Sequence, residues 1–108
     1  MNPLIQQNLS QVADLCGRFG VEALDVFGSA ASDAPLTPPN DLDFLVEFSQ
    51  ADSGSLFHRY FGLMEALEQL FERKVDLVSA GASTNPYFIA SVNQSRQPVY
   101  ASSRTLAA

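Results

Sequence analysis

The chain has 108 residues, of which 46% are hydrophobic and 17% are charged, and a formal net charge of −6. This length suits one domain around a single core and leaves no room for a separate substrate-binding domain. The excess of acidic side chains opposes non-specific binding to DNA or RNA. We find no apolar run of membrane-spanning length and no secretion signal, and the lone Cys16 cannot form an internal disulfide. A cytoplasmic protein without a membrane or direct nucleic-acid partner is therefore expected.

The first half of the chain predicts a helix, a strand and a loop. Asn2-Pro3 is typical of a helix start, and apolar residues then recur at helical spacing up to Gly20. Residues 21–27 predict a short strand that ends at Gly28-Ser29, and a brief helix follows over residues 28–32. Residues 32–40 contain three prolines and predict a surface loop.

The second half predicts two strands, two helices and a last edge strand. Residues 41–48 alternate as a strand, with the even positions facing the core: Leu42, Phe44, Val46 and Phe48. A helix follows whose broad apolar stripe holds Leu56, Phe57, Tyr60, Phe61, Leu63, Met64, Leu67, Leu70 and Phe71, opposite Arg59, Glu65, Glu68, Gln69 and Glu72. Residues 74–79 predict a third strand, Asn85-Pro86 starts a helix through about Gln94, and residues 98–100 predict an edge strand.

Two aspartates stand on one face of the second predicted strand. Asp41 and Asp43 are two residues apart, so both side chains point to the same side of the strand, from backbone positions roughly 6–7 Å apart. Carboxylates placed in this way can hold Mg²⁺, and two ions together can activate an attacking oxygen and stabilise a leaving pyrophosphate. Asp76 is the candidate third ligand, because an acidic residue is unusual in the apolar strand around it.

The Gly28-Ser29 turn after the first predicted strand is a candidate phosphate site. Its backbone N–H groups and the Ser29 hydroxyl can bind the oxygens of a nucleoside triphosphate. Taken singly, a D-x-D pair, a Gly-Ser turn or one acidic residue in a strand is common and structurally unremarkable. Their combination favours a site for a nucleotide and its magnesium.

With Gly28-Ser29, Asp41, Asp43 and Asp76, the chain resembles the minimal nucleotidyltransferases of the DNA polymerase β-like superfamily, whose signature is G-S…D-x-D…D. The resemblance extends from about Val21 to Tyr100. It implies an α/β (α+β) fold, a small mixed β-sheet flanked by helices, in one domain over residues 1–100 with a flexible tail at 101–108. It also implies Mg²⁺-dependent transfer of a nucleoside monophosphate to a hydroxyl.

Family members of this size often act as antitoxins of HEPN-domain ribonuclease toxins, some by attaching AMP from ATP to a tyrosine of the toxin. The resemblance implies that Asp41 and Asp43 hold magnesium, that Gly28 and Ser29 hold the triphosphate, and that Asp76 orients or deprotonates the acceptor while completing the metal site. An acidic chain suits a partner with a basic RNA-binding surface.

Two alternatives remain open. Many relatives have an arginine soon after Gly-Ser, whereas here Ala30 and Ala31 follow Ser29, which favours a catalytically weak antitoxin that neutralises its partner by binding alone. The other alternative is transfer to a small molecule such as an aminoglycoside. It ranks last, because such enzymes usually have an additional helical domain that forms the acceptor pocket.

Overall fold

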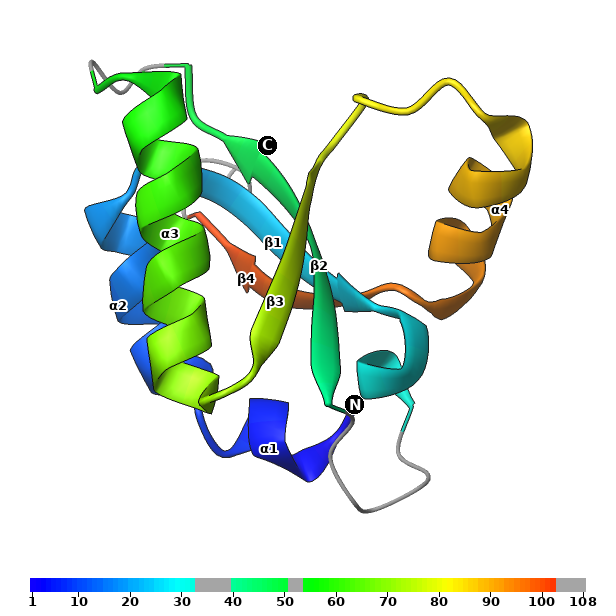
Figure 1. Cartoon of the computed structure of the whole chain (residues 1–108), viewed down its shortest axis with the longest axis horizontal. Coiled ribbons are helices and arrows are strands. Elements are labelled where there is room, and N and C mark those ends of the chain that lie inside the picture. Colours follow the sequence, from blue (N-terminus) through cyan, green and yellow to red (C-terminus); the bar gives the residue numbers. More distant parts are fainter. Residues whose placement is uncertain (33–39, 51–53, 103–108) are drawn as a thin grey trace.

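The computed structural model describes residues 1–32, 40–50 and 54–102, which fold as helices around one sheet (Figure 1). The elements in chain order are α1 (Pro3–Gln6), α2 (Leu9–Arg18), β1 (Val21–Phe27), the 3₁₀ turn η1 (Gly28–Ala31), β2 (Asp41–Phe48), α3 (Leu56–Phe71), β3 (Lys74–Ser79), α4 (Pro86–Ser95) and β4 (Gln97–Ala101).

The four strands form one mixed sheet in the order β3-β2-β1-β4. β1 runs antiparallel to both β2 and β4, whereas β3 lies parallel to β2. A parallel pair needs a crossover connection, and α3 supplies it between β2 and β3. The expected mixed sheet with flanking helices is confirmed, and the last predicted strand does lie at an edge.

The two faces of the sheet differ in what covers them. The even positions Leu42, Phe44 and Val46 of β2 are at most 1% exposed and belong to the main hydrophobic core, which also includes residues of α2 and α3. The Phe44 ring stacks on that of Phe71 in α3 at 6.1 Å. α4 lies on the other side of the sheet from α2 and α3 (Figure 1). The predicted core face of β2 is therefore correct, and its odd face is left for α4 and for polar side chains.

The expected single N-terminal helix is instead two helices with a break at Gln7 and Asn8. Asn8 leaves helical geometry, and its side-chain Nδ2 donates to the Leu4 carbonyl at 2.9 Å. Asparagine competes for backbone groups in this way and therefore favours helix ends. The expected caps are present: Asn2 Oδ1 accepts from Leu4 N–H and Asn85 Oδ1 accepts from Tyr87 N–H, each at 2.9 Å.

The predicted apolar stripe of α3 is buried only in its C-terminal part. Leu63, Leu67 and Phe71 are buried, but Leu56, Phe57 and Phe61 near the start are exposed. Arg59, predicted on the solvent face, is half-buried instead and donates to the carbonyls of Gly20 at 3.2 Å and Ser49 at 3.1 Å. Helical periodicity cannot show how far a helix extends past the core it packs on.

Two predicted segments lie wholly or partly outside the described residues. The proline-rich loop is described only at Ser32 and Asn40. At the C-terminus, β4 continues through Ala101, and the Ser102 N–H donates to the Glu22 carbonyl at 2.9 Å. Of the expected tail, residues 103–108 are not described.

Candidate active site

Asp43 and Asp76 stand side by side on the odd face of the sheet. They are register partners in the parallel pair β2–β3, so their side chains leave the same face. Burial raises the pKa of the Asp43 carboxyl, and the charge of Asp76, a hydrogen bond to Asp76 and the charge of Asp41 raise it further. The β2–β3 register therefore holds two acidic groups close together despite their mutual repulsion. A cation bound between them would reduce that repulsion.

Asp41 and Lys74 are register partners two positions before Asp43 and Asp76, at the starts of β2 and β3. Both are exposed, and both lie on the face that carries Asp43 and Asp76. Within residues 1–32, 40–50 and 54–102, no group of three or more His, Cys, Asp or Glu side chains forms a preformed metal site. Asp41 thus contributes negative charge near Asp43 without completing a closed ligand set.

Gly28 lies directly against Asp43. It has φ +72°, and a Cβ atom at this position would lie 2.7 Å from Asp43 Oδ2. A glycine is needed both for the left-handed backbone and for the close approach of the carboxylate. The predicted juxtaposition of the Gly-Ser turn and the D-x-D strand is therefore present, with Ser29 exposed at the start of η1.

The Gly28 N–H already has a partner within the chain. It donates to Ser95 Oγ at the end of α4, with a distance of 3.0 Å between the two atoms. From the sequence, this N–H was expected to donate to a phosphate, whereas in the structure it attaches α4 to the turn. Of the residues assigned to the phosphate turn, Ser29 is the one with an exposed side chain.

A pocket of about 470 Å³ contains the two central carboxylates. Asp43 and Asp76 share its lining with apolar and aromatic side chains: Phe27, Tyr60, Met64, Val75, Leu77, Val78 and Phe88. The rings of Phe27 and Phe88 meet edge to face at 6.1 Å. The apolar part of this lining withdraws the Asp43 carboxyl from water, and burial is the largest cause of its raised pKa.

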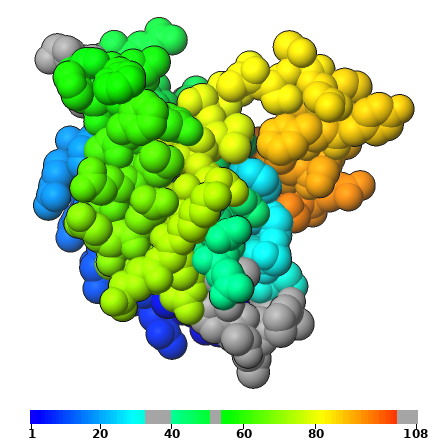
Figure 2. Space-filling view, viewed as in Figure 1, coloured from blue at the N-terminus to red at the C-terminus, as the bar shows by residue number. Residues whose placement is uncertain are grey.

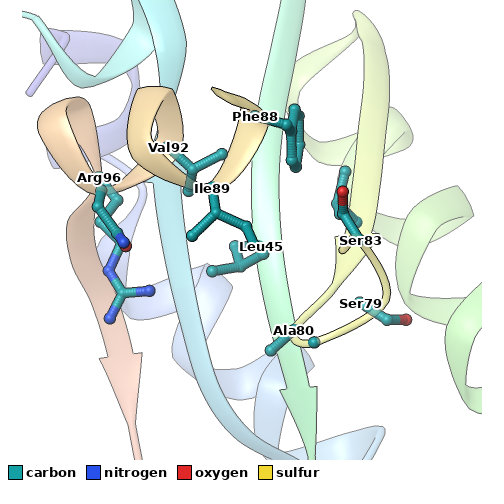
Figure 3. Close-up of a pocket in the computed structure, with 11 residues that line it drawn as sticks. Leu45, Ser79, Ala80, Ser83, Phe88, Ile89, Val92 and Arg96 are labelled. Atoms are coloured by element: carbon teal, nitrogen blue, oxygen red, sulfur yellow. The ribbon is translucent and has the colours of Figure 1, made fainter. Parts of the chain in front are cut away.

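A second, smaller pocket of about 190 Å³ lies under α4 (Figure 3). Leu45 of β2 forms its base, Ile89 and Val92 of α4 face Leu45, and Phe88 points toward Ser83 in the segment after β3. Phe88 and Val78 line both pockets. At the C-terminal end of α4, Arg96 Nε lies 3.4 Å from Asp25 Oδ2, and this ion pair attaches the end of the helix to β1.

Sequence reasoning missed three residues at this site: Lys74, Phe88 and Ser95. Lys74 lies two positions before Asp76 in a strand, so its presence on the same face was readable from the alternation. Nothing local indicates that Ser95 reaches Gly28 or that Phe88 meets Phe27, because both contacts depend on how α4 crosses the sheet.

The mixed sheet, the flanking helices and a carboxylate pair beside a Gly-Ser turn define a nucleotidyltransferase fold. Residues 10–105 match the sequence profile described as "Polymerase beta, Nucleotidyltransferase", and the chain belongs to this family. It is similar to two proteins of Methanocaldococcus jannaschii provisionally named protein adenylyltransferases, with 35% and 34% identity over 77 residues. The matches cover 71% of this chain and 74% and 75% of those proteins.

Solved structures agree on the fold. A protein provisionally described as a minimal nucleotidyltransferase superposes with a TM-score of 0.68 and 30% identity, covering 91% of this chain and 96% of its own. A complex of a tri-AMPylated Shewanella oneidensis HEPN toxin with an MNT antitoxin gives a TM-score of 0.62 at 17% identity, covering 94% and 76%. A toxin–antitoxin structure with AMP-PNP gives 0.64 at 18%, covering 91% and 77%. The last two show the fold alone.

Across the described ranges, each helix is too short or too polar to cross a bilayer.

Proposed function

We propose that this protein transfers AMP from ATP to a hydroxyl group of a HEPN-domain partner, with tyrosine as the acceptor, and thereby acts as its antitoxin. The observation that carries the proposal is the Asp43–Asp76 pair, held on one sheet face against the glycine of the Gly-Ser turn. The family indicates the class of reaction. The similar proteins and structures suggest ATP as the substrate and a HEPN-domain protein as the partner. We place the reaction in the cytoplasm.

In this reaction the acceptor oxygen forms a bond to the α-phosphorus of ATP, and the bond from that phosphorus to the bridging oxygen breaks, so that pyrophosphate leaves. Asp76 is exposed at the pocket and accepts the proton of the acceptor hydroxyl. Ser29 and the backbone of the turn bind the triphosphate, as the family resemblance implies. Lys74 adds a positive charge on the same face, where the turn itself has none.

The donor set fits magnesium. Asp43 and Asp76 are hard oxygen ligands, and the pKa of Asp43 is raised by burial and by its acidic neighbours Asp76 and Asp41, whose repulsion a bound cation would reduce. Asp41, Asp43 and Asp76 would hold the two ions, with the phosphate oxygens completing the coordination. Bound magnesium supplies charge neutralisation at the phosphates and a more nucleophilic acceptor oxygen.

The proposal is tested by incubating the chain with ATP labelled on the α-phosphate, Mg²⁺ and its cognate HEPN-domain protein. The partner should become labelled, and the label should disappear when its tyrosines are replaced by phenylalanine. Asp43→Asn should abolish labelling, because the pair loses a charged ligand. Asp14→Asn is the matched control, since Asp14 is exposed on α2, the helix on the other side of the sheet. Equal labelling by Asp43→Asn and the wild type would reject the assignment.

A second candidate function is neutralisation by binding alone. It is favoured by the Ser95 contact, which occupies the Gly28 N–H, and by the absence of a cation in the sequence directly after Ser29. In that case the Asp41→Asn/Asp43→Asn double variant should still neutralise the partner in cells. Loss of neutralisation with intact partner binding would reject this candidate and support the enzymatic one.

A further inference from the structure

The first turns of α3 expose three large apolar side chains. Leu56 is 59% exposed, Phe57 is 66% exposed and Phe61 is 46% exposed. We call these three residues the α3 aromatic patch. The Phe57 and Phe61 rings lie 4.7 Å apart, so the two form one continuous apolar surface. Contiguous exposed apolar surface of this kind commonly marks an interaction site.

The patch borders a hollow of about 500 Å³ that has no charged lining residue. Its floor is the C-terminal part of β3 with the segment that follows, and its wall is the start of α3: Leu77, Val78, Ser79 and Ala82 face Leu56, Phe57, Tyr60 and Phe61. Figure 2 shows the start of α3 in green beside the yellow-green β3 on one face of the molecule. The chain has 12 acidic residues, but none of those that the structure describes lines this hollow, so an apolar surface can enter it without burying a charge.

The hollow continues into the carboxylate pocket. Tyr60, Leu77 and Val78 line both, and Leu77 and Val78 directly follow Asp76 in β3. The Tyr60 hydroxyl donates to the Leu77 carbonyl, which fastens α3 to the outer edge of β3 at the junction. The patch and the carboxylates are thus parts of one surface, and the attachment of α3 to β3 fixes the distance between them.

We infer that the α3 aromatic patch docks the segment of the partner protein that carries the acceptor hydroxyl. This inference rests on the proposed function. The occupant is a segment with large apolar side chains close in sequence to the hydroxyl residue and with no neighbouring carboxylate, because Asp43 and Asp76 would repel one. Apolar anchoring on the patch holds the partner segment at the site with its hydroxyl beside Asp76, and this contact contributes equally to the bound substrate and to the transition state.

The position of the patch favours this occupant over a second copy of the chain. A copy seated on the hollow would cover the route from the patch to Asp76 and would obstruct the carboxylate pocket. A docked acceptor segment uses that same route. Self-association through the patch is therefore the competing outcome that an experiment must detect.

The test compares the wild type with the Phe57→Ser/Phe61→Ser double variant, using the cognate HEPN-domain protein and α-labelled ATP with Mg²⁺. Both phenylalanines are exposed, so the variant should fold; Phe57→Ser alone, at the more exposed position, is the second variant. Tyr87→Ser is the matched control, because Tyr87 is 86% exposed on α4 and lines neither pocket. Partner binding is measured by calorimetry, and the self-association of each variant by sedimentation.

We expect the double variant to raise the KM for the partner at least about tenfold, because it loses the side chains that anchor the interface. The kcat at saturating partner and the KM for ATP should be unchanged. Tyr87→Ser should match the wild type. Equal KM and equal partner affinity for the wild type and the double variant would overturn the inference. So would a wild-type dimer that the double variant disperses without weakening partner binding. A wild type that binds its partner but never labels it would reject the proposed function instead.

Discussion

The side chain of Asp43 is constrained by residues from several elements. Its neighbours on the sheet are Phe27 in β1 and Asp76 in β3, and Gly28 closes over its Oδ2 atom. A carboxyl group in this position is unfavourable for folding when it is ionised, because burial and two acidic neighbours oppose its charge. Strained carboxyl groups of this kind are common at functional sites, which supports the role proposed for Asp43.

The first prediction concerns pH and Asp43. The folded state holds the Asp43 proton more tightly than the unfolded chain, where the pKa is near the ordinary 3.8. The free energy of unfolding contributed by this group should therefore fall as the pH rises from about 3.8 through the raised pKa, and should level off above it. Asp43→Asn should remove this trend and be more stable than the wild type at pH 7.

This is measured by urea unfolding of both proteins from pH 4 to pH 7. Asp14→Asn, at an exposed position on α2, is the control and should follow the wild type. A stability difference between Asp43→Asn and the wild type that does not grow with pH would contradict the assignment. Adding Mg²⁺ should stabilise the wild type and leave Asp43→Asn unchanged.

Gly28 provides the second prediction. Alanine at this position would carry a Cβ 2.7 Å from Asp43 Oδ2 on a backbone with φ +72°. Either the turn or the carboxylate must move, so Gly28→Ala should lower the free energy of unfolding by about 1–3 kcal/mol. Gly81→Ala is an informative control in urea unfolding, because Gly81 also has positive φ but a Cβ there would meet nothing within 4 Å. A Gly28→Ala loss no larger than that of Gly81→Ala would contradict a role for the Asp43 contact.

At the scale of the elements, close packing of α2 on α3 depends on Gly62. A Cβ at Gly62 would lie 2.5 Å from Phe19 Cε1, so this glycine makes room for the ring that follows α2. The ring packs against the core, and its displacement would disturb that packing. Glycine inside a helix is otherwise unfavourable, which indicates that packing outweighs helix propensity here.

The third prediction compares glycines in the two helices. Gly62→Ala should destabilise the protein by about 1–3 kcal/mol through overpacking, even though alanine favours the helix. Gly17→Ala in α2 is the matched control, since a Cβ there meets nothing within 4 Å, and it should stabilise by roughly 0.5–1 kcal/mol. Thermal unfolding of both variants gives the sign directly. Stabilisation by both substitutions would show that Phe19 adapts without cost.

At the scale of the whole molecule, the core is shared by the sheet and the helices on one side. Cys16 of α2 is fully buried in it, and burial raises the pKa of its thiol to about 12. A thiol in this state is neutral and shielded at neutral pH, so it does not act as a nucleophile.

The fourth prediction follows from that burial. Cys16 should be alkylated by iodoacetamide only when the core opens, so its labelling rate in urea should follow the global unfolding equilibrium. Ser10→Cys places a second thiol on an exposed position of the same helix and should react rapidly in the native state. Mass spectrometry distinguishes the two sites. Rapid native labelling of Cys16 would contradict the packing of α2 described above.

Much of the fold was predictable because its signals are local. The strands at residues 21–27, 41–48 and 74–79 agree with the structure, since alternation and β-branched residues mark them directly. The break at Asn8 and the exposed start of α3 were not predicted. The first depends on a side-chain hydrogen bond to Leu4, and the second on where the core ends.

The sequence by itself determined the strands, the helices apart from the break at Asn8, and the shared face of Asp41 and Asp43. That face was predictable because a two-residue period in a strand admits one arrangement. Tertiary structure alone decided that Asp76 lies beside Asp43 and that Ser95 reaches Gly28. Register between strands and the crossing of α4 depend on contacts between distant segments. No short stretch of the chain contains the information about these contacts. The candidate active site nevertheless depends on them, because they bring its residues together.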